Sequence, residues 1–434
     1  MRILILSQVY WPDSASTAQH LADLGGALAG QGHEVRVLAS RHAYEDPSRV
    51  FPPWEKHRGV SIERLRHTGF GKGAVWRRLL DFGTFNLALL WRLLWLRRED
   101  AEVVLGLTSP PLISFLGVWI GRWKGWRFCY WAMDLQPELA IAAGMLARGS
   151  LAARALEQLS TSVFRQADRI VALDAYMAGY IRARGTRPDA LTVLPVWPVM
   201  QEGWSGPRLE NPFRVSAGLG DRFVIMYSGN HAVVHPLDTL LEAARRLRDD
   251  DRFLFVFIGG GVRVADVTRF RERYALSNVR QLPYQPREMI HQSLAAADLH
   301  VVVLGDGQVG FTHPNKVYGA MFLARPFLYL GPRPSHVTDL IEACPGNFWA
   351  SHGDPAALVE ALRAFHAAGP AHWEAIGRLN AAHARAHFSP AALTQQMCDL
   401  VVGTGERTAE IGGARTEAEA LDVPEEKAAS QPPA

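Results

Sequence analysis

Short apolar runs alternate along the chain with longer stretches in which apolar residues recur every three or four positions. The first run, Arg2–Gln8, predicts a strand that is buried on both faces of a parallel sheet. A helix is predicted from Ala18 to Gln31, with leucines along one face, and a second strand at Glu34–Ala39. A strand, a helix and a strand in such close succession are the building block of a doubly wound parallel sheet.

The alternation stops near Trp197–Gly220, which is rich in proline and glycine, and then starts again. Before this break, we predict strands at Val103–Leu107, Arg127–Trp131, Arg169–Leu173 and Leu191–Leu194, and helices at Ser150–Arg165 and Ala175–Gly185. After it, we predict strands at Phe223–Tyr227, Phe253–Ile258, Val279–Leu282, Leu299–Leu304 and Pro326–Leu330, and helices at Leu237–Leu247, Ala265–Tyr274, Pro286–Ala296, Asn315–Phe322, His336–Ala343 and Pro355–His366. The pattern predicts two α/β domains, at 1–199 and 221–389, joined by a linker at 200–220.

Two further segments follow the second domain. A last helix is predicted near 390–403, and residues 404–434 are rich in Glu, Ala and Pro with almost no large apolar side chains. Such a composition buries too little surface to offset the entropy of ordering, so this tail is predicted to be disordered. The tail holds seven acidic and three basic side chains, which leaves a net charge of +7 on the rest of the chain. A mildly basic body suits a partner with phosphates, such as a nucleotide sugar or a lipid phosphate, and its scattered charge argues against nucleic acid.

The composition, with 48% hydrophobic and 21% charged residues among 434, is that of a globular protein with two cores and excludes collagen-like chains and disulfide scaffolds. The three cysteines, Cys129, Cys344 and Cys398, lack the spacing of metal ligands and are expected to be buried thiols in a reducing compartment. The first apolar run, Met1–Val9, is too short for a secretory signal, so we expect a cytoplasmic location.

Loops that follow strands are the candidate sites, because ligands bind beyond the carboxyl ends of the strands in such folds. In the loop Gln8–Thr17, small polar residues precede a helix and leave backbone N–H groups open to an anion or a sugar hydroxyl. The alternative is an ordinary helix cap with Tyr10 and Trp11 packed as a lid. In the loop Trp131–Glu138, carboxylates follow a buried strand and are placed to bind acceptor hydroxyls or steer a proton. The alternative there is that Asp134 caps the next helix.

The turn Tyr227–Asp238 also joins a strand to a helix. Gly229 permits close backbone approach, so N–H groups and the helix dipole can cradle a diphosphate, with Asn230 and His235 as added donors. The alternative is that His231 and His235 are ordinary surface residues of a turn. Zinc is disfavoured, because no matching cysteine or carboxylate cluster accompanies the two histidines.

The glycine-rich loop Leu304–Lys316 is the fourth candidate. Pro314 is expected to open the helix that follows, and Lys316 to supply a cation for phosphate. The alternative is a loop that takes no part in a site. The glycines within Phe257–Gly261 do not form the GxGxxG pattern, and the first domain lacks it too, which argues against a dehydrogenase.

The stretch 76–98 combines leucine, tryptophan and phenylalanine with five arginines. Its longest uncharged part, Phe82–Trp91, is far shorter than the ~20 residues that span a bilayer. We expect a helix that either lies on an anionic membrane surface or belongs to the core, with its arginines reaching outward. A second basic, tryptophan-rich stretch at Trp119–Trp126 favours the membrane surface.

Over about residues 1–400 the chain carries, in order, the segments SQVYWPDSASTAQHLADLGGALAGQGHEVRVL, TSPP, DLQPE, ADRIVALDAYM, YSGN with HPLDTLLEAA, FIGGG, LPYQP and HPNKVYGAMFLARP. This series resembles glycosyltransferase family 4, in particular its bacterial members that build surface polysaccharides, of the colanic-acid WcaI-like or O-antigen WbuB-like kind. The resemblance implies a GT-B fold, in which two Rossmann-like doubly wound domains face a cleft and the last helix, 390–403, packs back on the first domain. It also implies that the second domain holds a UDP- or GDP-linked sugar, and that transfer retains the anomeric configuration and uses no metal or other cofactor.

Carried over by position, the resemblance places the acceptor-side loop at Asp13–Thr17, the diphosphate turn at Gly229–His235, the donor-sugar loop at Gly305–Lys316 and the base near Leu282–Gln285. We therefore predict donor contacts from Gly229, Asn230, His235, Tyr284, Gly310, Pro314, Asn315, Lys316 and Gly319, acceptor contacts from Asp13, Ser14, Ser16, Thr17 and Glu138, and catalytic roles for Asp134, Lys316 and His235. The acceptor is expected to be a sugar or a polyprenyl-diphosphate-linked glycan, reached at the inner face of the cytoplasmic membrane through 76–98.

The chain departs from the family pattern at three places. The family's Glu-x7-Glu pair falls on Phe311 and Gly319, so both carboxylates are absent. The usual Arg and Lys of the diphosphate turn are Asn230 and His235, and the glycine pair of the first loop is replaced by Ala15 and Ser16. Two other functions stay open on these grounds: a nucleotide-sugar 2-epimerase of the hydrolysing type, and a non-catalytic scaffold or binding subunit.

Overall fold

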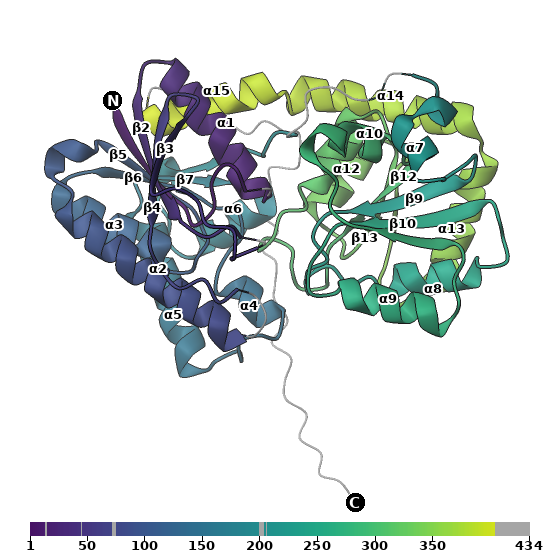
Figure 1. The fold of residues 1–434 in the computed structure, drawn as a ribbon, viewed down its shortest axis with the longest axis horizontal. Coiled ribbons are helices and arrows are strands. Elements are labelled where there is room, and N and C mark those ends of the chain that lie inside the picture. Colours follow the sequence, from purple (N-terminus) through teal and green to yellow (C-terminus); the bar gives the residue numbers. More distant parts are fainter. Residues whose placement is uncertain (14, 45, 72–74, 199–203, 205, 404–434) are drawn as a thin grey trace, which may run out of the picture.

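The computed structural model describes residues 1–13, 15–44, 46–71, 75–198, 204 and 206–403, which form two lobes (Figure 1). The first lobe holds the strands β1 (Arg2–Leu6), β2 (Glu34–Ser40), β3 (Trp54–His57), β4 (Val60–Leu65), β5 (Val103–Gly106), β6 (Arg127–Trp131), β7 (Arg169–Ala172) and β8 (Leu191–Val193). Its helices are α1 (Ser16–Gly30), α2 (Val75–Trp95), α3 (Ile113–Lys124), α4 (Glu138–Ala142), α5 (Leu151–Gln166) and α6 (Ala175–Ala183). The tail predicted at 404–434 lies outside the described residues.

The second lobe repeats this architecture. Its strands are β9 (Phe223–Ser228), β10 (Phe253–Ile258), β11 (Val279–Leu282), β12 (Leu299–Val303), β13 (Phe327–Leu330) and β14 (Phe348–Ala350). Its helices are α7 (Pro212–Ser216), α8 (Asp238–Arg246), α9 (Val264–Arg273), α10 (Ile290–Ala295), α11 (Lys316–Phe322), α12 (His336–Ala343) and α13 (Pro355–Ala367). Two last helices, α14 (Pro370–His387) and α15 (Pro390–Val402), run along one side of both lobes (Figure 1).

Both sheets have the doubly wound strand order. The first sheet is ordered β3-β4-β2-β1-β5-β6-β7-β8, and the second β11-β10-β9-β12-β13-β14. In each, the chain builds from the centre to one edge and then returns to extend the other side, so the order reverses between β1 and β5 and between β9 and β12. Ligands bind at such reversal points in open parallel sheets. The predicted fold class, two Rossmann-like doubly wound domains, is confirmed.

The sequence pattern missed the hairpin of β3 and β4 at the edge of the first sheet. This edge is built partly from buried charges, which hide the apolar signal of a strand. Glu63 is buried and its carboxylate binds Arg36 and Arg92, each at 2.5 Å. The buried Arg64 guanidinium binds Glu55 at 2.5 Å. Paired charges of this kind can be buried where single ones cannot. The sequence also gave no sign of the short β14 or of α14.

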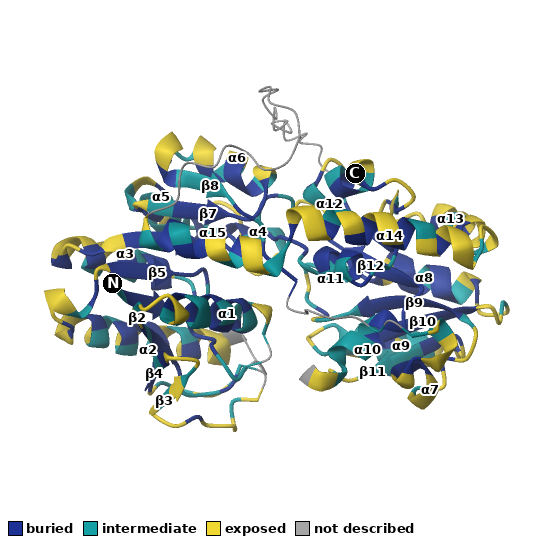
Figure 2. Ribbon diagram, turned by 90° about the horizontal axis from the view of Figure 1, so that it is seen from above, coloured by how far each residue is buried: buried dark blue, intermediate teal, exposed yellow. Residues whose placement is uncertain are grey.

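The last two helices tie the lobes together. Figure 2 shows α14 over the second lobe and α15 over the first, end to end. Leu393 and Met397 of α15 are buried in the core of the first lobe, and the helix packs against α1. The expectation that the last helix crosses back onto the first domain is therefore confirmed. The three cysteines are free and buried, also as expected.

Candidate active site

The carboxyl ends of the two sheets meet, because the loop that leaves β6 contacts the loop that leaves β12. The backbone N–H of Leu135 donates to the Phe311 carbonyl at 2.8 Å. Next to this bond, Asp134 and Thr312 pair as an isolated antiparallel bridge. The topology thus joins two of the four predicted loops, one from each lobe.

The turn after β9 lies directly against the turn after β10. Gly259 has a φ of +133°, and a Cβ there would lie 2.1 Å from the Gly229 carbonyl oxygen. A Cβ on Gly229 would lie 2.5 Å from Cε of Lys316. No larger side chain fits at either place without moving backbone or lysine. The glycines within Phe257–Gly261 do not form a dinucleotide fingerprint. Their lack of side chains instead allows the two turns and Lys316 to pack closely.

The hydroxyl of Tyr227, at the end of β9, is the centre of this arrangement. It donates to the Asn230 carbonyl at 2.7 Å and lies 3.2 Å from His235 Nδ1. It also accepts from Lys316 Nζ at 3.4 Å, and the ammonium stands 4.9 Å from the centroid of the Tyr227 ring. The predicted residues His235 and Lys316 thus share one hydroxyl contact, although they belong to different loops.

Lys316 is a desolvated cation that forms no ion pair within the described part of the chain. Desolvation lowers the pKa of its ammonium to about 8. Burial, and secondly the nearby Lys316 charge, hold the pKa of His235 well below its usual value, so this imidazole is neutral. A desolvated ammonium without a carboxylate is costly unless an anion binds it. This site is therefore prepared for an anionic group.

The other predicted residues of this turn surround the same place. His231 is buried, and its Nδ1 lies 3.1 Å from the Gly229 carbonyl and 3.2 Å from the Gly260 carbonyl. Its Nε2 is buried without a hydrogen-bond partner. Asn230 is exposed. The alternative that both histidines are ordinary surface residues is wrong, since His231 is buried and His235 is half-buried.

The start of α11 differs from the prediction. The helix begins at Lys316, so Pro314 lies in the turn before it and does not open it. The N-cap residue Asn315 makes no side-chain cap, and its Oδ1 is buried without a partner. Gly310 has a φ of +80° and lies against the first lobe, where a Cβ would be 3.2 Å from the Tyr176 carbonyl oxygen. Gly319 is half-buried in the helix.

Tyr284 lies beyond the end of β11, where the base of a nucleotide is expected. Its side chain is 43% exposed. Its ring covers Gly260, at which a Cβ would lie 2.7 Å from Cε2 of the tyrosine. The ring is therefore held in place on one side and open on another, as a stacking surface would be.

Asp134 lies at the contact between the lobes. Burial raises the pKa of its carboxyl to about 6, while the hydrogen bond to Thr312 and the charge of His313 act in the opposite direction. The alternative that Asp134 caps the next helix is wrong, because the N-cap residue of α4 is Pro137 and no side chain caps that helix. Asp134 thus lies half-buried between the lobes and takes no part in capping α4.

Glu138, predicted on the acceptor side, is buried within the first lobe. Its Oε1 accepts from the Tyr180 hydroxyl at 2.5 Å and lies 3.7 Å from Arg184. Its Oε2 is buried without a hydrogen-bond partner. The structure therefore gives this carboxylate two partners inside the lobe, Tyr180 and Arg184, and the predicted acceptor contact stays a prediction.

The loop before α1 contains the other predicted acceptor residues. Asp13 Oδ1 accepts from the Tyr44 backbone N–H at 3.0 Å, which ties this loop to the segment after β2. Ser16 is exposed and Thr17 half-buried, whereas Ser14 lies outside the described residues. The helix starts at Ser16, and its N-cap residue Ala15 gives no side-chain cap. The N-cap residue of α1 therefore leaves its first N–H groups without a side-chain cap, contrary to the alternative interpretation as far as the described residues go.

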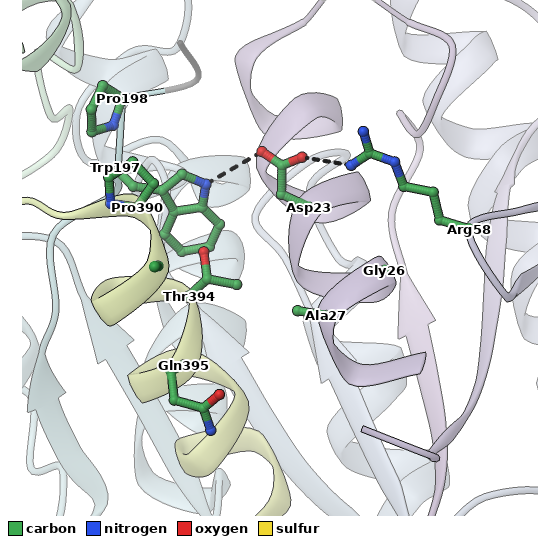
Figure 3. Close-up of a pocket in the computed structure, with 10 residues that line it drawn as sticks. Asp23, Gly26, Ala27, Arg58, Trp197, Pro198, Pro390, Thr394 and Gln395 are labelled. Atoms are coloured by element: carbon green, nitrogen blue, oxygen red, sulfur yellow. Dashed lines mark hydrogen bonds and ion pairs between the residues drawn. The ribbon is translucent and has the colours of Figure 1, made fainter. Parts of the chain in front are cut away.

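One cavity lies away from these residues. It measures about 510 Å³ and is lined by α1, the segment after β8 and the start of α15. Figure 3 shows Asp23 between two donors, Trp197 Nε1 at 3.4 Å and Arg58 at 3.2 Å. None of the predicted site residues lines this cavity. It lies where the chain passes between the lobes, near Trp197 and Pro390.

The second cavity is small and borders the acceptor-side loop. Its volume is about 40 Å³, close to that of one water molecule. Gln8, His67 and Arg78 are among its lining residues. Gln8 Oε1 and His67 Nδ1 are buried there without hydrogen-bond partners. No group of three or more potential metal ligands occurs within the described residues.

Sequence reasoning missed Tyr227, Asp174 and His313. Tyr227 is the last residue of a predicted strand, and the apolar pattern there indicates only a core position. Asp174 and His313 bind each other at 2.6 Å but are 139 positions apart in the chain, so no local pattern connects them. The only local signal was that each follows a predicted strand.

Comparisons with known proteins identify the chemistry that this fold carries. A family model described as glycosyl transferase 4-like domain matches residues 17–197. This part of the chain is a glycosyltransferase domain. The resemblance to glycosyltransferase family 4 is thereby confirmed, and the interpretation as a glycosyltransferase holds at this level.

Two relatives extend the similarity over most of the chain. WbjE of Pseudomonas aeruginosa, named as a glycosyltransferase, is 24% identical over 365 residues, or 83% of this chain and 88% of WbjE. WcaI of Escherichia coli K12, named as a colanic acid biosynthesis glycosyl transferase, is 23% identical over 366 residues, or 80% and 87% of the two chains. The crystal structure of HepE from Anabaena in complex with UDP superposes with a TM-score of 0.65 at 13% identity, covering 93% of this chain and all of HepE. The GT-B fold is confirmed by this likeness.

Proposed function

We propose that this glycosyltransferase transfers a hexose from a UDP- or GDP-linked donor to a hydroxyl of a glycan or a polyprenyl-diphosphate-linked glycan, with retention of the anomeric configuration. The observation that carries the proposal is Lys316, a desolvated ammonium without an ion pair among the described residues, held at the junction of the turns after β9 and β12. A nucleotide diphosphate supplies the missing anion. A relative named for colanic acid biosynthesis supports a role in making a bacterial surface polysaccharide.

On the donor side, Lys316 and the Gly229–His235 turn stabilise the departing diphosphate. The bond between the sugar carbon and the phosphate oxygen breaks as negative charge grows on that oxygen. Groups fixed in advance around a developing charge lower the barrier most where water is excluded. Tyr284 stacks on the base, and the missing carboxylates at Phe311 and Gly319 leave the ribose to weaker contacts.

On the acceptor side, Asp134 and the Asp13–Thr17 loop orient the attacking hydroxyl. The new bond joins the acceptor oxygen to the sugar carbon, and the hydroxyl proton passes to the departing phosphate oxygen. Asp134, whose pKa is raised to about 6 by burial, is mostly ionised at pH 7 and accepts a hydrogen bond from the hydroxyl. We further propose that the reaction needs no metal ion, because Lys316 supplies positive charge where the diphosphate departs. Activity that persists in EDTA tests this part.

The affinity for UDP should depend on pH through Lys316. Its charge is present below a pKa of about 8 and is lost above it, so UDP affinity should fall above pH 8. The affinity falls by up to about tenfold per pH unit. It levels off at higher pH, above the pKa that Lys316 has in the complex, which the bound diphosphate raises. Lys316→Arg keeps its charge throughout this range and should remove the fall. Titration calorimetry from pH 6.5 to 9.5 measures both; equal pH profiles of the two proteins would exclude Lys316 as the cause.

A thermal-shift screen with UDP, GDP, ADP, dTDP and their common sugar conjugates tests the proposed function. A ligand at about 100 times its dissociation constant adds ~2.7 kcal/mol to stability, which raises the melting temperature by several degrees. A shift with UDP or GDP and their sugars supports the donor site. No shift with any nucleotide would overturn the proposal and favour a scaffold, with Phe311 and Gly319 as the explanation. A product that is only an epimerised donor would favour the 2-epimerase.

We also propose that the first lobe binds the cytoplasmic face of an anionic membrane, where a polyprenyl-linked acceptor would be presented. One face of α2 is buried through residues such as Phe85 and Leu89, and the other exposes large apolar side chains. The exposed set is Trp76, Leu79, Leu80, Leu87, Trp91, Leu94 and Trp95, joined by Trp119 and Trp123 of the adjacent α3 (Figure 1). Lys124 of α3 donates to the Leu94 carbonyl at 3.0 Å and so fixes the two helices together. None of the described helices is long and apolar enough to cross a bilayer.

Replacing Trp91 and Trp95 by serine should weaken binding to vesicles that contain phosphatidylglycerol at least about tenfold, because both rings are exposed and insert at the headgroup level. Vesicle sedimentation measures the partition. The matched control is Trp54→Ser, which removes another exposed ring, from β3 rather than from α2. Equal loss in the control and the double variant would contradict a membrane-binding face on α2.

A further inference from the structure

A chain of buried polar groups crosses from the first lobe to the second. Asp174 Oδ2 and His313 Nδ1 are 2.6 Å apart, and His313 Nε2 lies 2.7 Å from the Tyr318 hydroxyl. The same hydroxyl lies 2.8 Å from His336 Nε2. Asp174, His313 and Tyr318 are each more than nine-tenths buried. Because Asp174 only accepts, His313 Nδ1 carries a proton, and the Tyr318 hydroxyl donates to one imidazole and accepts from the other.

The four residues 310–313 all contact the first lobe. Gly310 lies against the Tyr176 backbone, and the Phe311 ring meets the Tyr180 ring edge-on with centroids 4.8 Å apart. Phe311 also accepts a backbone hydrogen bond from the first lobe, and Thr312 forms its bridge there. His313 completes the series through Asp174. We call residues 310–313 the clasp.

The clasp is continuous with Lys316. The Asn315 N–H donates to the His313 carbonyl at 3.0 Å, and Tyr318 stands two residues after Lys316 in the same helix. The imidazole of His313 therefore connects the two ends of this arrangement. It is bonded to Asp174 of the first lobe on one side and to Tyr318, in the helix that carries Lys316, on the other. At Phe311, where the family resemblance places a carboxylate, this chain has an apolar contact between the lobes instead.

We propose that His313 is a positioning residue, which fixes the Lys316 turn by binding Asp174 of the opposite lobe, so that the donor site is complete only when the clasp is formed. The charged and titratable groups that face His313 are Asp174, Asp134 and His336. None of them has to contact the donor for the clasp to act. The role of Lys316 rests on the proposed function, whereas the clasp itself does not.

Replacing a residue of the first lobe should therefore weaken donor binding in the second. Asp174→Ala and His313→Ala should each weaken UDP binding about tenfold, and the double variant no further, because both remove the same charge-assisted hydrogen bond. Asp174→Asn retains an acceptor oxygen and should recover part of the affinity. Hydrogen exchange of peptides across 305–322 should be faster in both single variants. Titration calorimetry and exchange mass spectrometry supply these values.

Asp354→Ala is the matched control. Asp174 caps α6 by accepting from Met177 N at 2.8 Å, and Asp354 caps α13 by accepting from Ala357 N at 3.0 Å, so both changes remove one helix cap. The control should lower stability alike and leave UDP affinity and exchange at 305–322 unchanged. Unchanged exchange at 305–322 in Asp174→Ala would overturn the proposal, as would a purely thermal effect equal to that of the control. If the wild-type protein binds neither UDP nor GDP, the proposed function fails, and the exchange data alone still decide whether the clasp exists.

Discussion

Lys316→Ala should bind UDP or GDP, whichever the wild-type protein binds, about ten to a hundred times more weakly. The loss is that of a charge-assisted hydrogen bond to diphosphate, worth about 1.5–3 kcal/mol. Turnover should fall further, because the ammonium interacts most strongly with the charge that develops on the departing diphosphate. Removing a desolvated cation without an ion-pair partner should leave stability unchanged or raise it. Titration calorimetry, melting curves and initial rates give the three quantities.

The control for this variant is Lys56→Ala, which removes an exposed lysine of β3. It should leave both affinity and rate at wild-type values. Nucleotide affinity and turnover of Lys316→Ala equal to those of the wild type would refute the donor site described above. Weaker binding with an unchanged rate at saturation would mean that Lys316 holds the ground state only.

Gly259→Ala should destabilise the second lobe by about 3 kcal/mol and abolish nucleotide binding. The new Cβ would lie 2.1 Å from the Gly229 carbonyl oxygen, a backbone atom that moves only with the turn, and the residue would keep a φ of +133°. Strain at such an angle and overpacking each cost about 1–3 kcal/mol. The melting temperature should therefore drop by about 6–12 °C, as calorimetry would record.

Gly179→Ala provides the comparison. This glycine lies within α6, and a Cβ there meets nothing within 4 Å. The change should be neutral or stabilise by about 0.4–1 kcal/mol, because alanine restricts the unfolded chain. If Gly259→Ala behaved like Gly179→Ala, the two turns would not be packed as closely as described.

The proximity of the proposed donor residues could be predicted from the sequence because they follow neighbouring strands. β9 and β12 are adjacent in the sheet, so the turn with Gly229 and His235 and the loop with Lys316 end at the same edge. A periodic pattern that locates the strands therefore also locates the site. We expected Pro314 to open the helix, but α11 begins two residues later, at Lys316. A proline marks the approach to a helix without determining its first residue.

The surroundings of the proposed acceptor residues were less predictable, because a carboxylate after a strand has several possible partners. Asp134 lies at the contact between the lobes, whereas Glu138, four residues later, binds Tyr180 inside the first lobe. Nothing in the local sequence distinguishes these two environments, which depend on residues more than 40 positions away. The same reason hid the Asp174–His313 bond and the buried ion pairs of the β3–β4 edge.

The polypeptide passes between the lobes at two adjacent places, after β8 and between α14 and α15, and Trp197 and Pro390 at these places line one cavity. A single connection would allow the lobes to swivel freely. Two connections define a line, about which rotation remains easy while twisting and sliding are opposed. The clasp lies near these connections, because the Tyr318 ring, bonded to His313, packs against the ring of Phe388, two residues before Pro390, with centroids 4.6 Å apart. A group close to a rotation axis moves little, so small rotations near Pro390 would leave the Asp174–His313 bond in place while the outer parts of the lobes move apart.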